Sequence, residues 1–190
     1  MPFILPCQTI QAMEIKPNHL LRDTDLLFTE AQVSSAVDHI AQGITREMSD
    51  ALPLVLCVMT GGLYLTGALL PKLKFPLELD YVHATRYRGE TQGHEVLWEA
   101  LPHQDIHGRT ILLVDDILDE GHTLAAVRDK LLKLGANQIS IAVLVEKELD
   151  HAKPIGADFV GFAVPNRYVF GCGMDVYGWW RNLTEIRALK

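Results

Sequence analysis

Hydrophobic and polar positions alternate along this chain in blocks that predict helices and strands in turn. Between Thr29 and Met48 the apolar residues recur at helical spacing and predict a long helix, with a stripe formed by Val33, Ala36, Val37, Ile40, Ile44 and Met48. Mostly apolar segments predict strands at residues 54–59, 77–84, 95–101, 111–114, 139–145 and 159–164. A short helix is expected after the first strand, to about Leu73, and a longer one after residue 123, to Leu134 before Gly135.

Alternation of strands and helices predicts an α/β fold, a mostly parallel twisted sheet flanked by helices on both faces. Ligands of such sheets bind beyond the carboxyl ends of the strands, so polar or glycine-rich residues should follow each strand at that edge. They do: the segments that follow the strands are Thr60-Gly61-Gly62, residues 86–91, residues 115–123, Glu146-Lys147 and residues 165–168. The sequence therefore predicts one ligand site formed from several loops.

The segment from Ile111 to Thr123 is the most informative part of the chain. Four apolar residues lead into Asp115 and Asp116, and then a short turn with Asp119 and Gly121 leads into a helix. Backbone N–H groups at such a helix start can hold a phosphate, and carboxylates beside it suit sugar hydroxyls or a metal ion. An acidic turn before an ordinary helix is the alternative. Three carboxylates so close together favour a site, because a cation or sugar relieves their repulsion.

This run resembles the phosphoribosyl-diphosphate (PRPP) signature of the type I phosphoribosyltransferases, namely a hydrophobic strand, two acidic residues, two apolar residues and Asp-x-Gly-x-Thr. Residues 30–181 resemble the hypoxanthine–guanine branch of that family. The match rests on the Gly-Gly loop, the aromatic-bearing loop after the second strand, a Lys after a strand, and Asp-Phe-Val-Gly-Phe followed by Tyr-Val and an Asp. The resemblance implies a single domain over residues 1–190, with a core at about 29–165 and a small hood from about 1–28 and 166–190.

The resemblance also implies Mg²⁺-dependent transfer of a phosphoribosyl group from PRPP to hypoxanthine or guanine, with Asp119 as the general base. The residues implied to bind PRPP are Asp115, Asp116, Glu120, Gly121, His122, Thr123, Thr60, Gly61, Arg86, Tyr87, Arg88 and Arg181. The purine would meet Lys147, Tyr168 and the backbone of Val169. Asp175, with Asp115 and Asp116, would hold the metal.

Several of these residues have a second interpretation. Lys147 has acidic neighbours and could be a solvated ion-pair partner, Asp175 and Arg181 could pair with each other, and Tyr168 could be a core or surface residue. Trp179 and Trp180 could cap the base or anchor a core or an interface.

Three segments depart from the family pattern. Thr60 stands where many relatives carry Lys, so Arg86 or Arg88 would supply that pyrophosphate contact or it is missing. Glu120 and His122 replace common loop residues, and Glu120 suits a phosphate loop only if its side chain faces solvent. The loop after the second strand reads Arg-Tyr-Arg rather than the commoner Ser-Tyr form.

Composition and charge narrow the classes of function. The chain has 190 residues, of which 48% are hydrophobic and 22% charged, as in an ordinary globular enzyme. A formal net charge of −7 argues against nucleic-acid binding, and no apolar run approaches membrane-spanning length. Three widely spaced cysteines indicate reduced thiols and a cytoplasmic protein.

The alternatives left open are a PRPP-sensing regulatory protein and a xanthine- or adenine-preferring enzyme. Family resemblance further implies a homodimer or homotetramer.

Overall fold

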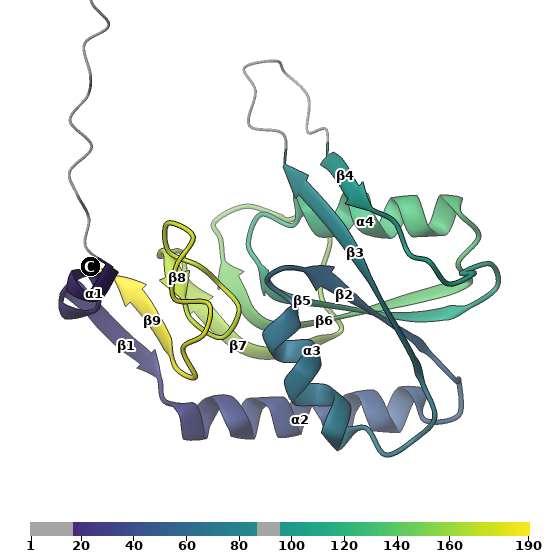
Figure 1. Cartoon of the computed structure of the whole chain (residues 1–190), viewed down its shortest axis with the longest axis horizontal. Helices are drawn as coiled ribbons and strands as arrows, with labels where there is room; N and C mark the ends of the chain where they lie inside the picture. Colours follow the sequence, from purple (N-terminus) through teal and green to yellow (C-terminus); the bar gives the residue numbers. More distant parts are fainter. Residues whose placement is uncertain (1–16, 87–95) are drawn as a thin grey trace, which may run out of the picture.

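The computed structural model describes residues 17–86 and 96–190, with the side chain of Arg86 left out (Figure 1). Its larger sheet has the strand order β4-β3-β2-β5-β6-β7. The strands are β2 (Leu54–Met59), β3 (Glu78–Arg86), β4 (Val96–Ala100), β5 (Thr110–Leu118), β6 (Gln138–Glu148) and β7 (Phe159–Pro165). All neighbours are parallel except β4, which pairs antiparallel with β3. The predicted mostly parallel sheet is confirmed.

Helices cover both faces of this sheet, as the alternating pattern predicts. One face packs against α2 (Glu30–Met48) and α3 (Leu63–Leu69), the latter continued by the 3-10 turn η2 (Leu70–Lys72), and the other face packs against α4 (His122–Lys133). Every residue of the predicted stripe on α2 is buried. None of the described helices is long and apolar enough to span a membrane.

Local sequence signals set the ends of the helices. Thr29 and Gln32 form a capping box at the start of α2, with each side chain bonded to the other residue's backbone N–H. After α4, Gly135 adopts a φ of +97° and ends the helix as predicted, because a left-handed residue turns the chain out of the helical path.

A second, three-stranded sheet joins the two ends of the described chain. Its order is β1-β9-β8, with β1 (Thr24–Phe28), β9 (Ile186–Leu189) and β8 (Val169–Phe170). A short helix α1 (Pro17–Leu20) and the 3-10 turn η1 (Leu21–Asp23) precede β1. The Arg167 guanidinium ties the sheet together by donating to Asp25 Oδ2 at 2.6 Å and to the Leu189 carbonyl at 2.7 Å. We call this unit the terminal sheet; Figure 1 shows it beside the larger sheet.

Two strands run further than their apolar patterns predict. The pattern ends the strand that begins at Ile111 at Val114, yet the pairing of β5 with β6 continues through Asp115 and Ile117 to Leu118. The next strand was expected to end at Val145, with Lys147 just beyond it, yet β6 extends to Glu148 and contains Lys147. Both predictions were wrong for the same reason: backbone pairing with a neighbouring strand holds polar residues in an extended conformation.

Asp80 on β3 anchors the turn that follows β4. Its carboxylate accepts the backbone N–H groups of Tyr81, His103 and Gln104, and its side chain is 7% exposed. Burial alone would raise the pKa of Asp80, but these hydrogen bonds outweigh it and the pKa is lowered.

We therefore expect Asp80→Ala to lower the free energy of unfolding by about 2 kcal/mol at neutral pH. A lowered folded-state pKa gives stability that is present above the unfolded pKa of about 3.9 and is lost as the pH falls through the folded value. Urea unfolding should therefore show a difference in unfolding free energy between wild type and Asp80→Ala that decreases at acidic pH. A difference that stays unchanged at low pH would contradict the role of the ionised carboxylate.

Candidate active site

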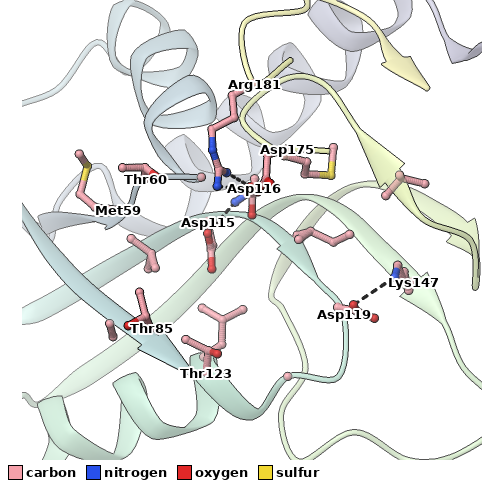
Figure 2. A pocket seen from close by; sticks show the side chains of 18 of the residues that line it. Met59, Thr60, Thr85, Asp115, Asp116, Asp119, Thr123, Lys147, Asp175 and Arg181 are labelled. Atoms are coloured by element: carbon pink, nitrogen blue, oxygen red, sulfur yellow. Dashed lines mark hydrogen bonds and ion pairs between the residues drawn. The ribbon is translucent and has the colours of Figure 1, made fainter. Parts of the chain in front are cut away.

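A cavity of about 730 Å³ opens at the carboxyl ends of the central parallel strands. Its lining comes from both faces of the sheet, from the start of α4 and from the segment that follows β7 (Figure 2). Twelve of the predicted site residues line it, namely Thr60, Gly61, Asp115, Asp116, Asp119, Gly121, Thr123, Lys147, Tyr168, Val169, Asp175 and Arg181. The topology thus brings together residues from five segments of the chain.

Asp115 and Asp116 lie within β5 and project in different directions. In Figure 2, Asp116 points toward Arg181 and Asp175, whereas Asp115 points to the side where Thr85 and Thr123 lie. Asp115 Oδ1 accepts the backbone N–H of Asp116 at 2.9 Å. Burial raises the pKa of both carboxyls, and the charge of Asp116 raises that of Asp115 further. A cation or a sugar diol that replaced the lost water would favour the ionised pair.

Arg181 lies in the segment between β8 and β9 of the terminal sheet, and its side chain reaches the same place. Its guanidinium pairs with Asp175 Oδ1 at 2.6 Å, lies 3.9 Å from Asp116 Oδ2, and donates to the Gly173 carbonyl at 2.7 Å. The pairing of Asp175 with Arg181, which sequence spacing allowed as a second interpretation, is therefore present. It does not remove either residue from the cavity, because both line it.

The turn after β5 forms an anion-binding geometry at the start of α4. Gly121 has a φ of +81° and stands immediately before the first helical residue, His122. The first N–H groups of a helix have no acceptor within it, and they carry the positive end of the helix dipole. Gly121 and Thr123 face the cavity, so a phosphate held there would lie beside Asp115 and Asp119.

The Thr60-Gly61 loop is packed too tightly for any side chain at Gly61. A Cβ built on Gly61 would lie 2.1 Å from Asp116 Oδ2, and the Gly61 carbonyl oxygen lies 2.2 Å from the Cβ position of Gly173. The peptide bond between Met59 and Thr60 is cis. Gly61 thus lies between the β5 carboxylate and Gly173, with its backbone exposed to the cavity.

Asp119 and Lys147 meet in the part of the cavity away from Thr60 (Figure 2). Lys147 Nζ donates to Asp119 Oδ2 at 3.0 Å, and their side chains are 12% and 40% exposed. Lys147 is thus an ion-pair partner, as its acidic surroundings allowed, but its partner is the predicted catalytic residue. Tyr168 and Val169 complete this part of the lining; Tyr168 is half exposed, and Val169 is buried.

Several predicted residues do not line the cavity or lie outside the described part of the chain. Glu120 turns to His151, with Glu120 Oε2 and His151 Nε2 2.9 Å apart, and it is absent from the cavity wall, as is His122. Tyr87 and Arg88, with the side chain of Arg86, lie outside the described residues. Trp180 anchors α1, because its indole N–H donates to the Pro17 carbonyl at 3.0 Å.

The cavity also contains residues that the sequence reasoning did not select. They are Val58, Met59, His83, Ala84, Thr85, Ile117, Leu124 and Met174. The position of Thr85 next to the polar segment after the second predicted strand was a usable signal. Ile117 had none, since an apolar residue between two acidic positions is more often core, and its place on the wall depends on how β5 ends.

The carboxylates suit a magnesium ion that arrives with a phosphate ligand. Among residues 17–86 and 96–190, no three potential ligand side chains gather closely enough to hold a metal by themselves. Magnesium usually takes one or two protein carboxylates and completes its shell with substrate phosphates and water. Buried Asp116 and half-buried Asp115, both with raised pKa values, fit that mode, and Asp175 lies on the same wall.

Comparison with known proteins identifies the class to which this fold and site belong. Residues 24–177 match the phosphoribosyl transferase domain family. The hypoxanthine-guanine phosphoribosyltransferase of Bacillus subtilis is 32% identical over 167 residues, which are 87% of this chain and 92% of the relative. The hypoxanthine-guanine-xanthine phosphoribosyltransferase of Tritrichomonas foetus is 30% identical over 167 residues, 87% of this chain and 91% of the relative. The chain belongs to the phosphoribosyltransferase family, in its hypoxanthine-guanine branch.

Solved structures agree with this placement. A hypoxanthine phosphoribosyltransferase from Staphylococcus aureus shares the fold with a TM-score of 0.84 at 24% identity, over 90% of this chain and 95% of the other. The Trypanosoma cruzi hypoxanthine phosphoribosyltransferase, solved with its product IMP, has a TM-score of 0.79 at 26% identity, over 87% and 93% of the two chains. The predicted family, fold and enzyme class are confirmed.

Proposed function

We propose that this enzyme transfers the 5-phosphoribosyl group of PRPP to the N9 nitrogen of hypoxanthine or guanine and releases pyrophosphate. The observation that carries the choice of base is the 3.0 Å pair of Lys147 and Asp119. A 6-oxopurine presents O6 and N7 side by side on one edge. A lysine that only donates suits O6, and an adjacent carboxylate suits a proton on N7.

Specificity against adenine follows from the same pair. Adenine places an amino donor where the 6-oxopurines have an acceptor, so the Lys147 ammonium would face a second donor with no acceptor between them. A buried polar group left unpaired costs about 1–3 kcal/mol, and more when it is charged. Lys147 is only 12% exposed, so little water is available to compensate.

The sugar phosphate is proposed to lie between the two ends of the cavity. The N–H groups around Gly121 and the Thr123 hydroxyl would hold the 5-phosphate, and Asp115 and Asp116 would hold the ribose hydroxyls. Thr60, Gly61 and Arg181 would contact the pyrophosphate, and Asp175 with the β5 carboxylates would hold Mg²⁺. When bound, Mg²⁺ neutralises charge on the leaving pyrophosphate.

The transfer requires one bond to form as another breaks. The N9 lone pair forms a bond to the anomeric carbon as the bond from that carbon to the pyrophosphate oxygen breaks and its electrons leave with pyrophosphate. The N7 proton passes to the Asp119 carboxylate, which keeps positive charge from building up on the purine. Lys147 holds O6, and Tyr168 with the Val169 backbone fixes the plane and edge of the base.

The proposal also covers the role of the terminal sheet, the location of the enzyme and its assembly. Val169 begins β8 and lines the cavity, which supports a role for the terminal sheet as a hood over the base. Cys57 and Cys172 are buried free thiols, which supports a reducing, cytoplasmic location. A homodimer or homotetramer remains our prediction for the assembly.

A spectrophotometric assay with PRPP, Mg²⁺ and each of hypoxanthine, guanine, xanthine and adenine tests the proposal. We expect turnover of hypoxanthine or guanine and none of adenine. Xanthine is included because a relative's name includes it. Tight PRPP binding without turnover of any base would overturn the proposed reaction and favour a PRPP sensor.

Lys147→Met should reduce kcat/KM for the 6-oxopurine by about 10- to 100-fold, because a charge-assisted hydrogen bond contributes about 1.5–3 kcal/mol. The loss should appear mainly in the KM for the base, and the KM for PRPP should change little. Lys133→Met, at the exposed end of α4, is the matched control and should behave as wild type. An unchanged base KM in Lys147→Met would contradict base recognition by this residue.

A further inference from the structure

Lys153 lies in the connection between β6 and β7 and does not line the cavity described above. Its side chain is 10% exposed. The ammonium donates to the Lys147 carbonyl at 2.5 Å, to Glu146 Oε1 at 3.1 Å and to the Leu118 carbonyl at 3.3 Å. An ammonium has three protons, so three acceptors use its full capacity. A lysine so held occupies one defined position, unlike a solvated surface lysine.

The two carbonyls that Lys153 binds belong to the backbone that carries Asp119 and Lys147. Leu118 is the last residue of β5, and its carbonyl belongs to the peptide that leads into Asp119. The other carbonyl is that of Lys147 itself, on β6. Beyond the pairing of Leu118 with Glu146, the two strands share no further registered pair. Lys153 thus joins the strand ends where the regular pairing stops.

The two residues that follow Lys153 contact the turn after β5. Pro154 and Ile155 lie behind Gly121, with Pro154 Cδ 3.5 Å and Ile155 Cγ2 3.0 Å from the position of a Cβ on that glycine. Ile155 is 7% exposed and packs in the core under α4. These contacts hold the proposed phosphate-binding turn without help from Lys153. The hydrogen bonds of Lys153 therefore act on the positions of Asp119 and Lys147.

We propose that Lys153 is a positioning residue of the transfer reaction, which sets Asp119 and Lys147 at the spacing that the N7 and O6 edge of a 6-oxopurine requires. The proposal rests on the proposed function and extends it by one residue. It predicts that loss of Lys153 changes kcat and the KM for the base. The KM for PRPP should change little, because the proposed phosphate-binding turn keeps its contacts with Pro154 and Ile155.

The test compares Lys153→Met, which removes the three donors, with Lys153→Arg, which keeps the charge and several donors. Because small misplacements of catalytic groups can cost about 100-fold, we expect kcat of Lys153→Met to fall by roughly 30-fold and the KM for the base to rise by roughly tenfold. The KM for PRPP should stay within about threefold, since its phosphate is held elsewhere. Lys153→Arg should recover most of kcat.

Two further variants separate positioning from fold stability. Lys72→Met removes a lysine that pairs with Asp38 at 2.6 Å on the exposed side of α2, and it should leave all kinetic constants unchanged. Glu146→Gln leaves both carbonyls bound to Lys153 and should cost far less than Lys153→Met. Thermal unfolding of each variant gives the folded fraction at the assay temperature.

Wild-type turnover in the same assay distinguishes failure of this inference from failure of the proposed function. An inactive wild type would overturn both. Active wild type with Lys153→Met unchanged would overturn the positioning role alone. A fall in kcat of Lys153→Met that only matches its smaller folded fraction, with unchanged KM values, would also overturn the positioning role. That result would show that Lys153 only stabilises the fold. If Lys153→Met does not fold, Lys153→Gln replaces it with the same expected fall in kcat and rise in the KM for the base, and a folded Lys153→Gln protein with wild-type constants overturns the positioning role equally.

Discussion

Asp119→Asn is expected to lower kcat by about 10²- to 10⁴-fold, the range that a positioned general base contributes. The substitution keeps an oxygen within reach of Lys147 Nζ, now 3.0 Å from Asp119 Oδ2, so the ion pair becomes a hydrogen bond of similar shape. It removes the charge that is proposed to receive the purine proton. Binding of PRPP should therefore persist while transfer nearly stops, and steady-state kinetics together with PRPP titration would show both.

Asp129→Asn provides the matched control for that loss. Asp129 lies on α4, 54% exposed and paired with the neighbouring Arg128, away from the cavity wall. Its loss should change neither kcat nor KM, because an exposed ion pair contributes little. If Asp119→Asn retained more than about a tenth of the wild-type kcat, below the range for a general base, Asp119 would not be the base.

Gly61→Ala is expected to weaken PRPP binding and transfer by about 100-fold or more, because a small displacement at a reacting site has that effect. The added methyl would lie 2.1 Å from Asp116 Oδ2 and 2.5 Å from its Cγ. Asp116 is only 7% exposed and lies beside Arg181, so it cannot rotate into solvent. The substitution must shift either the carboxylate or the loop, and both belong to the proposed pyrophosphate and ribose contacts.

Gly67→Ala tests the same chemical change where there is room for it. Gly67 lies within α3, and no atom comes within 4 Å of a Cβ built there. Alanine in a helix interior should raise stability by about 0.5–1 kcal/mol and leave activity unchanged. Isothermal titration with PRPP and thermal unfolding of both variants would measure these effects. Equal PRPP affinity in Gly61→Ala and wild type would contradict the proposed role of this loop.

Local patterns in the sequence determined much of the core. The stripe from Val33 to Met48 places one face of α2 on the sheet, and Thr29 with Gln32 begins that helix through contacts between residues three apart. Continuous apolar runs mark β2 and the centre of β6 because both faces of a parallel sheet are covered. The signature around Asp115 to Thr123 identified the family, since its glycine and acidic residues lie at fixed spacings within a few positions of one another.

Tertiary structure decided what no local pattern encodes. The strands of the terminal sheet are short, so their hydrophobic spacing gives little signal. The paired strands β1 and β9 also lie near opposite ends of the described chain. The length of β5 depends on pairing with β6, which keeps Asp115 and Asp116 extended against their intrinsic preference. The approach of Lys147 to Asp119 and of Lys153 to Leu118 joins residues 28 and 35 positions apart.

The sequence by itself thus determined the family, the alternation of elements and most of the residues around the site, because periodicity, glycine conformation and charge act over a few neighbouring positions. The tertiary structure decided which carboxylates lie next to Arg181 and which carboxylate lies next to Lys147. It also decided how the ends of β5 and β6 are held together. Those contacts depend on where distant backbone segments meet in space, and side-chain charges pair with whatever lies within reach there.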